Sequence, residues 1–362
     1  MKTRKTVLLI PLLWAALTLL LWFGPRQSVS DSERRPLAQA PEISMQTILN
    51  GKFMADFEDF TLDQFPFRDN FRTLKALFHQ KILGQQDNNG IYLSDGYAAK
   101  MEYPLNLTSV DHAIGRFTHL YEQYLTDSRV FMAIVPDKGY YLAEQSGHLS
   151  MDYDAMFAAF REKLPFSAPI DLTDTLSAED YYRTDTHWRQ ENLLPAAAKL
   201  CQALGIPAPE AENYRPITLD RPFYGVYYGQ AALPMEPDSL TYLQSDVLEK
   251  CTVYDHETGK TASVYDLSKE TSKDLYDVFL SGAKPLLTIE NPSAESEKEL
   301  IVFRDSFGSA MIPLLVHGYK TVTVVDIRYL ASDLLPQFVE FSGQDVLLLY
   351  STLVLNSSDT LK

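Results

Sequence analysis

The chain has 362 residues, of which 46% are hydrophobic and 22% are charged, so it is long and apolar enough to bury a sizeable core, and extensive disorder is not expected. Its formal net charge of −16 argues against nucleic acid as the main partner. The two cysteines, Cys201 and Cys251, are too few for a disulfide framework and lack metal-site spacing, and no cofactor is expected.

The first 25 residues differ from the rest of the chain. A short basic segment is followed by an uncharged, almost wholly apolar run from residue 7 to residue 24. This pattern favours an uncleaved signal anchor at 1–25, forming a single transmembrane helix at the cell membrane, over a cleaved export signal. The positive residues should hold the N-terminus in the cytoplasm and leave the rest of the chain extracytoplasmic. Residues 26–42 are polar and contain proline, which is typical of a linker.

Residues 43–362 are expected to form one extracytoplasmic domain that begins with helices. Apolar residues recur at helical spacing between about 43 and 128. Short apolar runs follow at 130–135, 301–303, 322–325 and 346–349, and the last three are separated by helical patterns near 310–317 and 334–341. This order predicts an α/β fold with a parallel sheet and flanking helices. A β-rich insertion is expected at about 205–281, where it would shape an acceptor groove.

Charged residues follow three of these predicted strands: Lys138 comes after the first, Arg304 and Asp305 after the second, and Arg328 after the third. Ligands of open α/β sheets bind beyond the carboxyl ends of the strands. We therefore expect these side chains to lie near a functional site, although polar loops are common at strand ends in any protein.

Two segments carry the chemistry that the sequence indicates. Ser306 follows an apolar strand and precedes a helix, where neighbouring N–H groups can stabilise an oxyanion. Histidine side chains titrate near neutrality, which suits a base for a serine hydroxyl. His187 is the candidate, and Asp185, two positions earlier, can orient its ring if the segment is not helical. Capping of a helix by Asp305 and Ser306, or by Asp185, is the simpler alternative for each segment taken alone.

Together the Asp-Thr-His-Trp segment at 185–188 and the Asp-Ser pair at 305–306 resemble motifs of the bacterial DHHW family. Further segments share this resemblance, at 32–37, 65–68, 135–138 and 326–329. That family is similar to the SGNH-like domains of alginate O-acetyltransferases. The resemblance implies a flavodoxin-like SGNH-hydrolase-like domain with a triad of Asp185, His187 and Ser306. Thr186 stands where the family has its first His, and Arg304 replaces the usual Gly before Asp-Ser.

The resemblance implies a serine-dependent acyl-ester enzyme acting on a cell-envelope polysaccharide or exopolysaccharide, as an O-acetyltransferase or an acetylesterase. Its partners would be the polysaccharide acceptor and a multi-pass membrane O-acyltransferase that donates the acetyl group. Arg328 is a candidate for electrostatic support, and Tyr224, Tyr228 and Trp188 are candidate substrate contacts.

Two other functions stay open at this point. The chain could be a catalytically silent module that binds glycans or scaffolds an envelope complex, which Arg304 before Asp-Ser motivates. It could also be a metal phosphoesterase that uses Asp185, His187 and Asp305, although no tight His-rich spacing supports a metal site.

Overall fold

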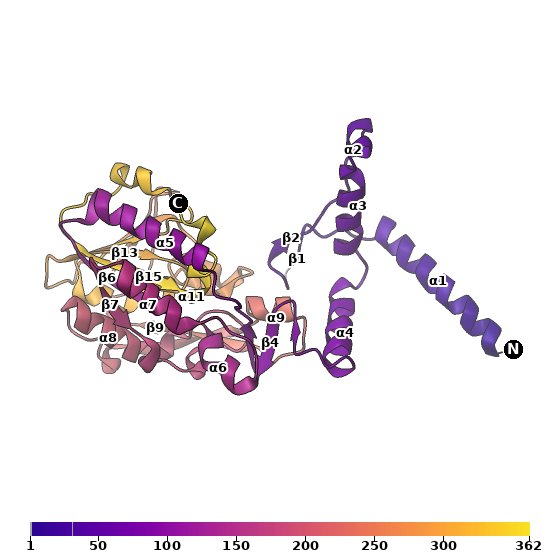
Figure 1. Cartoon of the computed structure of the whole chain (residues 1–362), viewed down its shortest axis with the longest axis horizontal. Helices are drawn as coiled ribbons and strands as arrows, with labels where there is room; N and C mark the ends of the chain where they lie inside the picture. The colour runs from indigo at the N-terminus through magenta and orange to yellow at the C-terminus, as the bar shows by residue number, and fades with distance from the viewer. Residues whose placement is uncertain (1, 31) are drawn as a thin grey trace. The chain divides into compact units, whose positions relative to one another are not determined.

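The structure is a computed structural model that describes residues 2–30 and 32–362, and its contacts divide the chain into two compact units. The first unit comprises residues 1–90 and 228–235, and the second comprises residues 91–227 and 236–362. Figure 1 shows the course of the chain through both units.

The first unit is built mainly from helices. Its elements are α1 (Lys2–Phe23), β1 (Val29–Ser30), β2 (Arg35–Pro36), α2 (Met45–Leu49), α3 (Lys52–Asp63), α4 (Arg68–Lys81), β3 (Asp87–Asn88) and the end of α9 (Val226–Ala231). Ion pairs connect the motif segment at 32–37 with the region of the motif segment at 65–68. Arg35 donates two hydrogen bonds to Asp63, at 2.8 and 2.6 Å, and Arg68 pairs with Glu33 at 2.5 Å. Both motifs therefore have structural contacts within this unit.

The prediction of a transmembrane anchor at the N-terminus is wrong. Within the described ranges, the structure contains no helix with the length and apolar character needed to cross a membrane. The helix at this position is α1, and Pro11 lies inside it. The single-pass localisation that rested on this anchor is corrected by the same finding.

An eight-stranded sheet forms the centre of the second unit, with strand order β11-β10-β12-β14-β13-β15-β6-β7. The strands are β6 (Arg129–Val135), β7 (Ser167–Asp171), β10 (Thr252–Asp255), β11 (Lys260–Ala262), β12 (Leu286–Glu290), β13 (Glu299–Arg304), β14 (Thr321–Val325) and β15 (Asp345–Ser351). The run from β14 to β7 is parallel, as predicted for the core, whereas β12, β10 and β11 extend it with antiparallel pairs. The sheet is therefore mixed.

Helices cover both faces of this sheet (Figure 1). Alternate residues of β6, β13 and β15 pack with α8 (Leu194–Leu204) on one face, and the others pack with α5 (Leu107–Leu120) and α7 (Tyr153–Lys163) on the opposite face. The remaining elements are β4 (Ile91–Ser94), β5 (Tyr97–Lys100), α6 (Lys138–Ser146), β8 (Arg215–Phe223), β9 (Asp238–Gln244), α10 (Gly308–Met311) and α11 (Thr352–Leu355). The central strands β6, β13 and β15 are apolar on both sides because both sides are buried.

The connections after β13 and β14 are less helical than the sequence pattern predicts. After β13, α10 has four residues and then tightens into short 3₁₀ turns that contain Pro313. After β14, the connection is a 3₁₀ helix at Ser332–Gln337, with Pro336 inside it. Proline lacks the N–H that a longer α-helix needs, which explains both departures.

Candidate functional site

The Asp-Thr-His-Trp segment forms a closed loop between two paired ends. Tyr181 and Trp188 form an isolated antiparallel bridge, and the Tyr182 N–H donates to the His187 carbonyl at 3.0 Å. Helix α8 begins only later, with Pro195 in its first turn, where a missing N–H costs no helical hydrogen bond. The loop is therefore non-helical, and residues 185 and 187 can face each other.

Asp185, His187 and Ser306 form a continuous hydrogen-bonded chain. The Asp185 Oδ1 atom lies 2.6 Å from His187 Nδ1, and His187 Nε2 lies 2.8 Å from Ser306 Oγ. These contacts assign the imidazole proton to Nδ1, so that Nε2 accepts from the serine hydroxyl. Asp185 is fully buried, His187 is buried and Ser306 is half-buried, so solvent access increases toward the serine.

A network of backbone donors holds Asp185 in place. Its Oδ1 also accepts the His187 N–H at 3.1 Å, and its Oδ2 accepts the Val226 N–H at 2.8 Å. Beside Val226, a Cβ on Gly225 would lie 2.3 Å from the Asp185 Cα, so only glycine allows this approach. Thr184 donates to Asp238 at 2.6 Å and accepts the Gly225 N–H at 2.9 Å, which ties the two segments together.

The turn that carries Ser306 is fixed by its neighbours. Asp305 accepts the Phe307 N–H at 3.0 Å and the Ser351 N–H at 2.8 Å, which joins the ends of β13 and β15. The fully buried Trp188 donates from its indole nitrogen to the Phe307 carbonyl at 3.0 Å. Asp305 therefore connects the turn that carries Ser306 to the sheet, and Trp188 connects it to the loop at 181–188, the histidine loop.

The two candidate arginines, Arg304 and Arg328, meet at Asp326. Arg328 donates two hydrogen bonds to Asp326, at 2.9 and 2.7 Å; burial lowers its pKa, these bonds raise it, and the net shift is upward. Arg304 is fully buried and donates to the carbonyls of Asp305 and Gly282, at 3.3 and 3.2 Å, and burial lowers its pKa. Both guanidinium groups are therefore engaged in supporting the loops around Ser306.

Lys138 is buried behind the histidine loop. Its Nζ atom donates to the Tyr182 carbonyl at 2.8 Å and to the Arg183 carbonyl at 3.4 Å. Burial lowers the pKa of Lys138 to about 7, although Asp185, Asp238 and Asp137 each raise it. Lys138 therefore supports the loop backbone rather than contacting the triad directly.

The three aromatic candidates occupy different environments. Tyr224 is exposed in the second unit, whereas Trp188 is buried as described above, and Tyr228 belongs to the part of α9 in the first unit. Sequence reasoning missed Tyr276, whose ring stacks on His187 with a centroid distance of 3.9 Å. It also missed Val226 and Asp238, because contacts between such distant segments leave no local sequence pattern.

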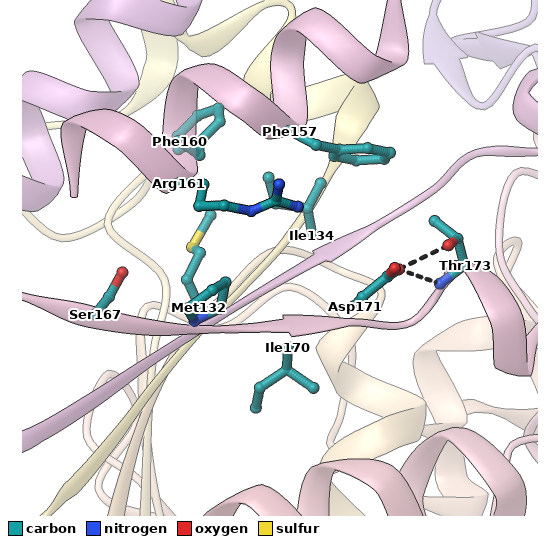
Figure 2. Close-up of a pocket in the computed structure, with 10 residues that line it drawn as sticks. Met132, Ile134, Phe157, Phe160, Arg161, Ser167, Ile170, Asp171 and Thr173 are labelled. Atoms are coloured by element: carbon teal, nitrogen blue, oxygen red, sulfur yellow. Dashed lines mark hydrogen bonds between the residues drawn. The ribbon is translucent and has the colours of Figure 1, made fainter. Parts of the chain in front are cut away.

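A cavity of about 70 Å³ lies elsewhere in the second unit, between β6, β7 and α7. Figure 2 shows Arg161 among its apolar lining residues, and Asp171 accepting two hydrogen bonds from Thr173. None of the triad residues lines it. Across residues 2–30 and 32–362, no cluster of three or more His, Cys, Asp or Glu side chains has the arrangement of a metal site.

Comparisons with known proteins agree with this fold. Residues 173–325 match the family model described as DHHW protein. A DHHW family protein from Eubacterium siraeum is similar in structure, with a TM-score of 0.63 and 22% identity, covering 76% of this chain and 95% of that one. Bacillus cereus PatB1, solved with a sulfonyl adduct, gives a TM-score of 0.57 and 19% identity, and the match covers 75% of this chain and 97% of that one.

A more distant match is the O-acetyltransferase domain of Pseudomonas putida AlgJ, with a TM-score of 0.44 and 14% identity, covering 74% of this chain and 92% of that domain. No protein of curated function matches the sequence. The matched residues 173–325 contain Asp185, His187 and Ser306. The resemblance to the DHHW family indicated by the sequence motifs is therefore confirmed.

Proposed function

We propose that this protein is a serine-dependent acyl-ester enzyme, with Ser306 as nucleophile, His187 as base and acid, and Asp185 as the group that orients His187. The observation that carries the proposal is the hydrogen-bonded chain from Asp185 to Ser306, with contacts of 2.6 and 2.8 Å. A serine hydroxyl becomes nucleophilic when such a base removes its proton, and a buried carboxylate stabilises the imidazolium that forms.

The reaction has two balanced halves. Ser306 Oγ attacks the carbonyl carbon of an acetyl ester while its proton moves to His187 Nε2, and the leaving alcohol departs with that proton. An acceptor hydroxyl then gives its proton to His187 and attacks the acyl-enzyme, and His187 passes that proton to Ser306 as the new ester is released. The Ser306 N–H, for which the described part of the chain offers no acceptor, is suited to stabilise the oxyanion.

A polysaccharide hydroxyl is the acceptor that we propose, which makes the protein an O-acetyltransferase. The fold similarity to PatB1 and to the DHHW family protein supports the SGNH-like class but leaves the acceptor open. Water in place of the sugar hydroxyl would make the same site an acetylesterase, since the two reactions share every catalytic group.

The test measures aryl acetate cleavage, acetyl transfer to oligosaccharides, and covalent labelling by a sulfonyl fluoride, each for the wild type and for Ser306→Ala. Loss of a triad serine lowers the rate by about four to six orders of magnitude. Ser293→Ala, a change at an exposed serine, is the matched control and should behave as the wild type. Equal activity in the wild type and Ser306→Ala would refute the nucleophile. Absence of labelling together with retained glycan binding would favour a silent binding module.

A further inference from the structure

A tyrosine ring lies flat against the imidazole of His187. The rings of Tyr276 and His187 have a centroid distance of 3.9 Å and an interplanar angle of 7°. Tyr276 belongs to a short 3₁₀ helix, Leu275–Val278, on the connection between β11 and β12. Asp274 precedes this helix and accepts the Tyr276 N–H at 3.0 Å, which fixes the backbone that carries the ring.

The contacts of the Tyr276 side chain are made by its aromatic ring rather than by its hydroxyl. Tyr276 is 4% exposed, and the centroid of the Phe279 ring lies 4.9 Å from that of Tyr276 at an interplanar angle of 58°. The Tyr276 hydroxyl is buried and makes no hydrogen bond of ordinary geometry within the described ranges, and the nearby Trp188 indole N–H donates to the Phe307 carbonyl instead. An unpaired buried hydroxyl contributes nothing favourable to stability, so the aromatic face is the part of this side chain that the contacts use.

The stacked Tyr276 ring restrains the one motion of the imidazole that the hydrogen bonds of His187 leave free, which is tilting of the ring plane. Asp185 and Ser306 fix the two ring nitrogens within the plane of the imidazole, and they do little to resist tilting of that plane. A parallel aromatic ring resists the tilt. The face of an aromatic ring also carries negative electrostatic potential, which favours a cation placed against it.

We infer that Tyr276 is a positioning residue that keeps the imidazole of His187 in the plane of the triad and stabilises the imidazolium formed during acyl transfer. This inference rests on the proposed function. The charged groups near this pair come from several elements: Asp185 from the histidine loop, Asp305 and Arg304 from the end of β13, and Lys138 from α6, which acts on Asp185. The inference predicts that replacing the ring changes the pH dependence of the reaction.

The test compares Tyr276→Leu, Tyr276→Phe and Phe279→Leu in the full chain. For each variant, kcat/KM for an aryl acetate and the labelling rate with a sulfonyl fluoride are measured from pH 5 to pH 9. In Tyr276→Leu we expect the plateau of kcat/KM in the pH profile to fall roughly three- to thirtyfold, since a desolvated cation–ring contact has about this effect. The acidic limb should move to lower pH by about 0.5–1.5 units, because the imidazolium has become less stable.

Tyr276→Phe keeps the ring and should restore both the plateau and the position of the acidic limb. Phe279→Leu removes a buried aromatic ring that packs at a tilt against Tyr276 rather than on His187, so it should lower the Tm without moving the acidic limb. An unshifted limb in Tyr276→Leu, or a loss in Tyr276→Phe as large as in Tyr276→Leu, would overturn the inference. Equal activity in the wild type and Ser306→Ala would overturn the proposed function instead.

Discussion

Replacing Asp185 with asparagine tests the proposed mechanism at its most buried group. All three polar contacts described for the carboxylate are donors: the His187 N–H, His187 Nδ1 and the Val226 N–H. An amide has only one acceptor oxygen. Its NH₂ group must therefore face either the Val226 N–H, as one donor against another, or His187 Nδ1.

Each orientation is harmful for a different reason. If the NH₂ group faces Val226, a buried donor is left unsatisfied at a cost of about 1–3 kcal/mol. If it faces Nδ1, the imidazole proton moves to Nε2, which then donates to Ser306 and no longer accepts its proton. In either orientation the charge-assisted hydrogen bond to the imidazolium is lost, which raises the barrier by about 1.5–3 kcal/mol. That corresponds to a decrease of about one to two orders of magnitude in kcat, and the wrong imidazole tautomer extends the decrease to about four orders.

The assay is steady-state cleavage of an aryl acetate at a pH where wild-type activity is maximal, together with thermal unfolding of each variant. Asp246→Asn is the matched control, because Asp246 is 81% exposed and pairs with Arg215 at the surface. Its activity should equal that of the wild type. An Asp185→Asn enzyme that is folded and stays within about threefold of the wild type would refute the role of Asp185.

Two further predictions concern residues that hold the triad in place. Gly225→Ala should lower kcat by about two orders of magnitude, because the added Cβ would lie 2.3 Å from the Asp185 Cα and must displace the carboxylate. A wild-type rate in this variant would contradict the close approach of the two backbones. For Lys138, the pKa is lowered from 10.5 to about 7 in the folded chain, so the unfolded chain binds more protons between these values and the stability contributed at this position rises with pH. Urea unfolding at pH 7.5 and 9.5 should therefore show that the free energy of unfolding of the wild type rises by a few kcal/mol, relative to that of Lys138→Met, at the higher pH. A difference between the two proteins that does not depend on pH would contradict a buried amine that is largely neutral.

The parallel part of the sheet could be predicted from the sequence, because strands buried on both faces are continuous apolar runs. The runs at 130–135, 301–303, 322–325 and 346–349 all lie within parallel strands. The β-rich insertion expected at about 205–281 contains β10 and β11, but the sequence did not predict that these strands and β12 extend the main sheet with antiparallel pairs, because pairing between distant strands leaves no local pattern. The transmembrane prediction was wrong, since within the described ranges no helix has the length and apolar character needed to cross a membrane.

The triad residues could be nominated from the sequence because each belongs to a short motif with a plausible chemical role. The groups that hold them could not. Val226, Asp238 and Tyr276 reach the histidine loop from distant parts of the chain, and the residue types involved are common elsewhere in the sequence. The catalytic roles of Asp185, His187 and Ser306 stay predictions until the variants are measured.

The wide sequence separation within the site has a consequence for how the protein folds. The contact between His187 and Ser306 closes 119 residues of chain, and that between Asp185 and Val226 closes 41. Closing such long loops costs conformational entropy before any contact compensates for it, and chains rich in distant contacts fold slowly. We therefore expect the hydrogen-bonded chain of Asp185, His187 and Ser306 to assemble only once β13 has joined the sheet, and activity to return during refolding later than the helices form.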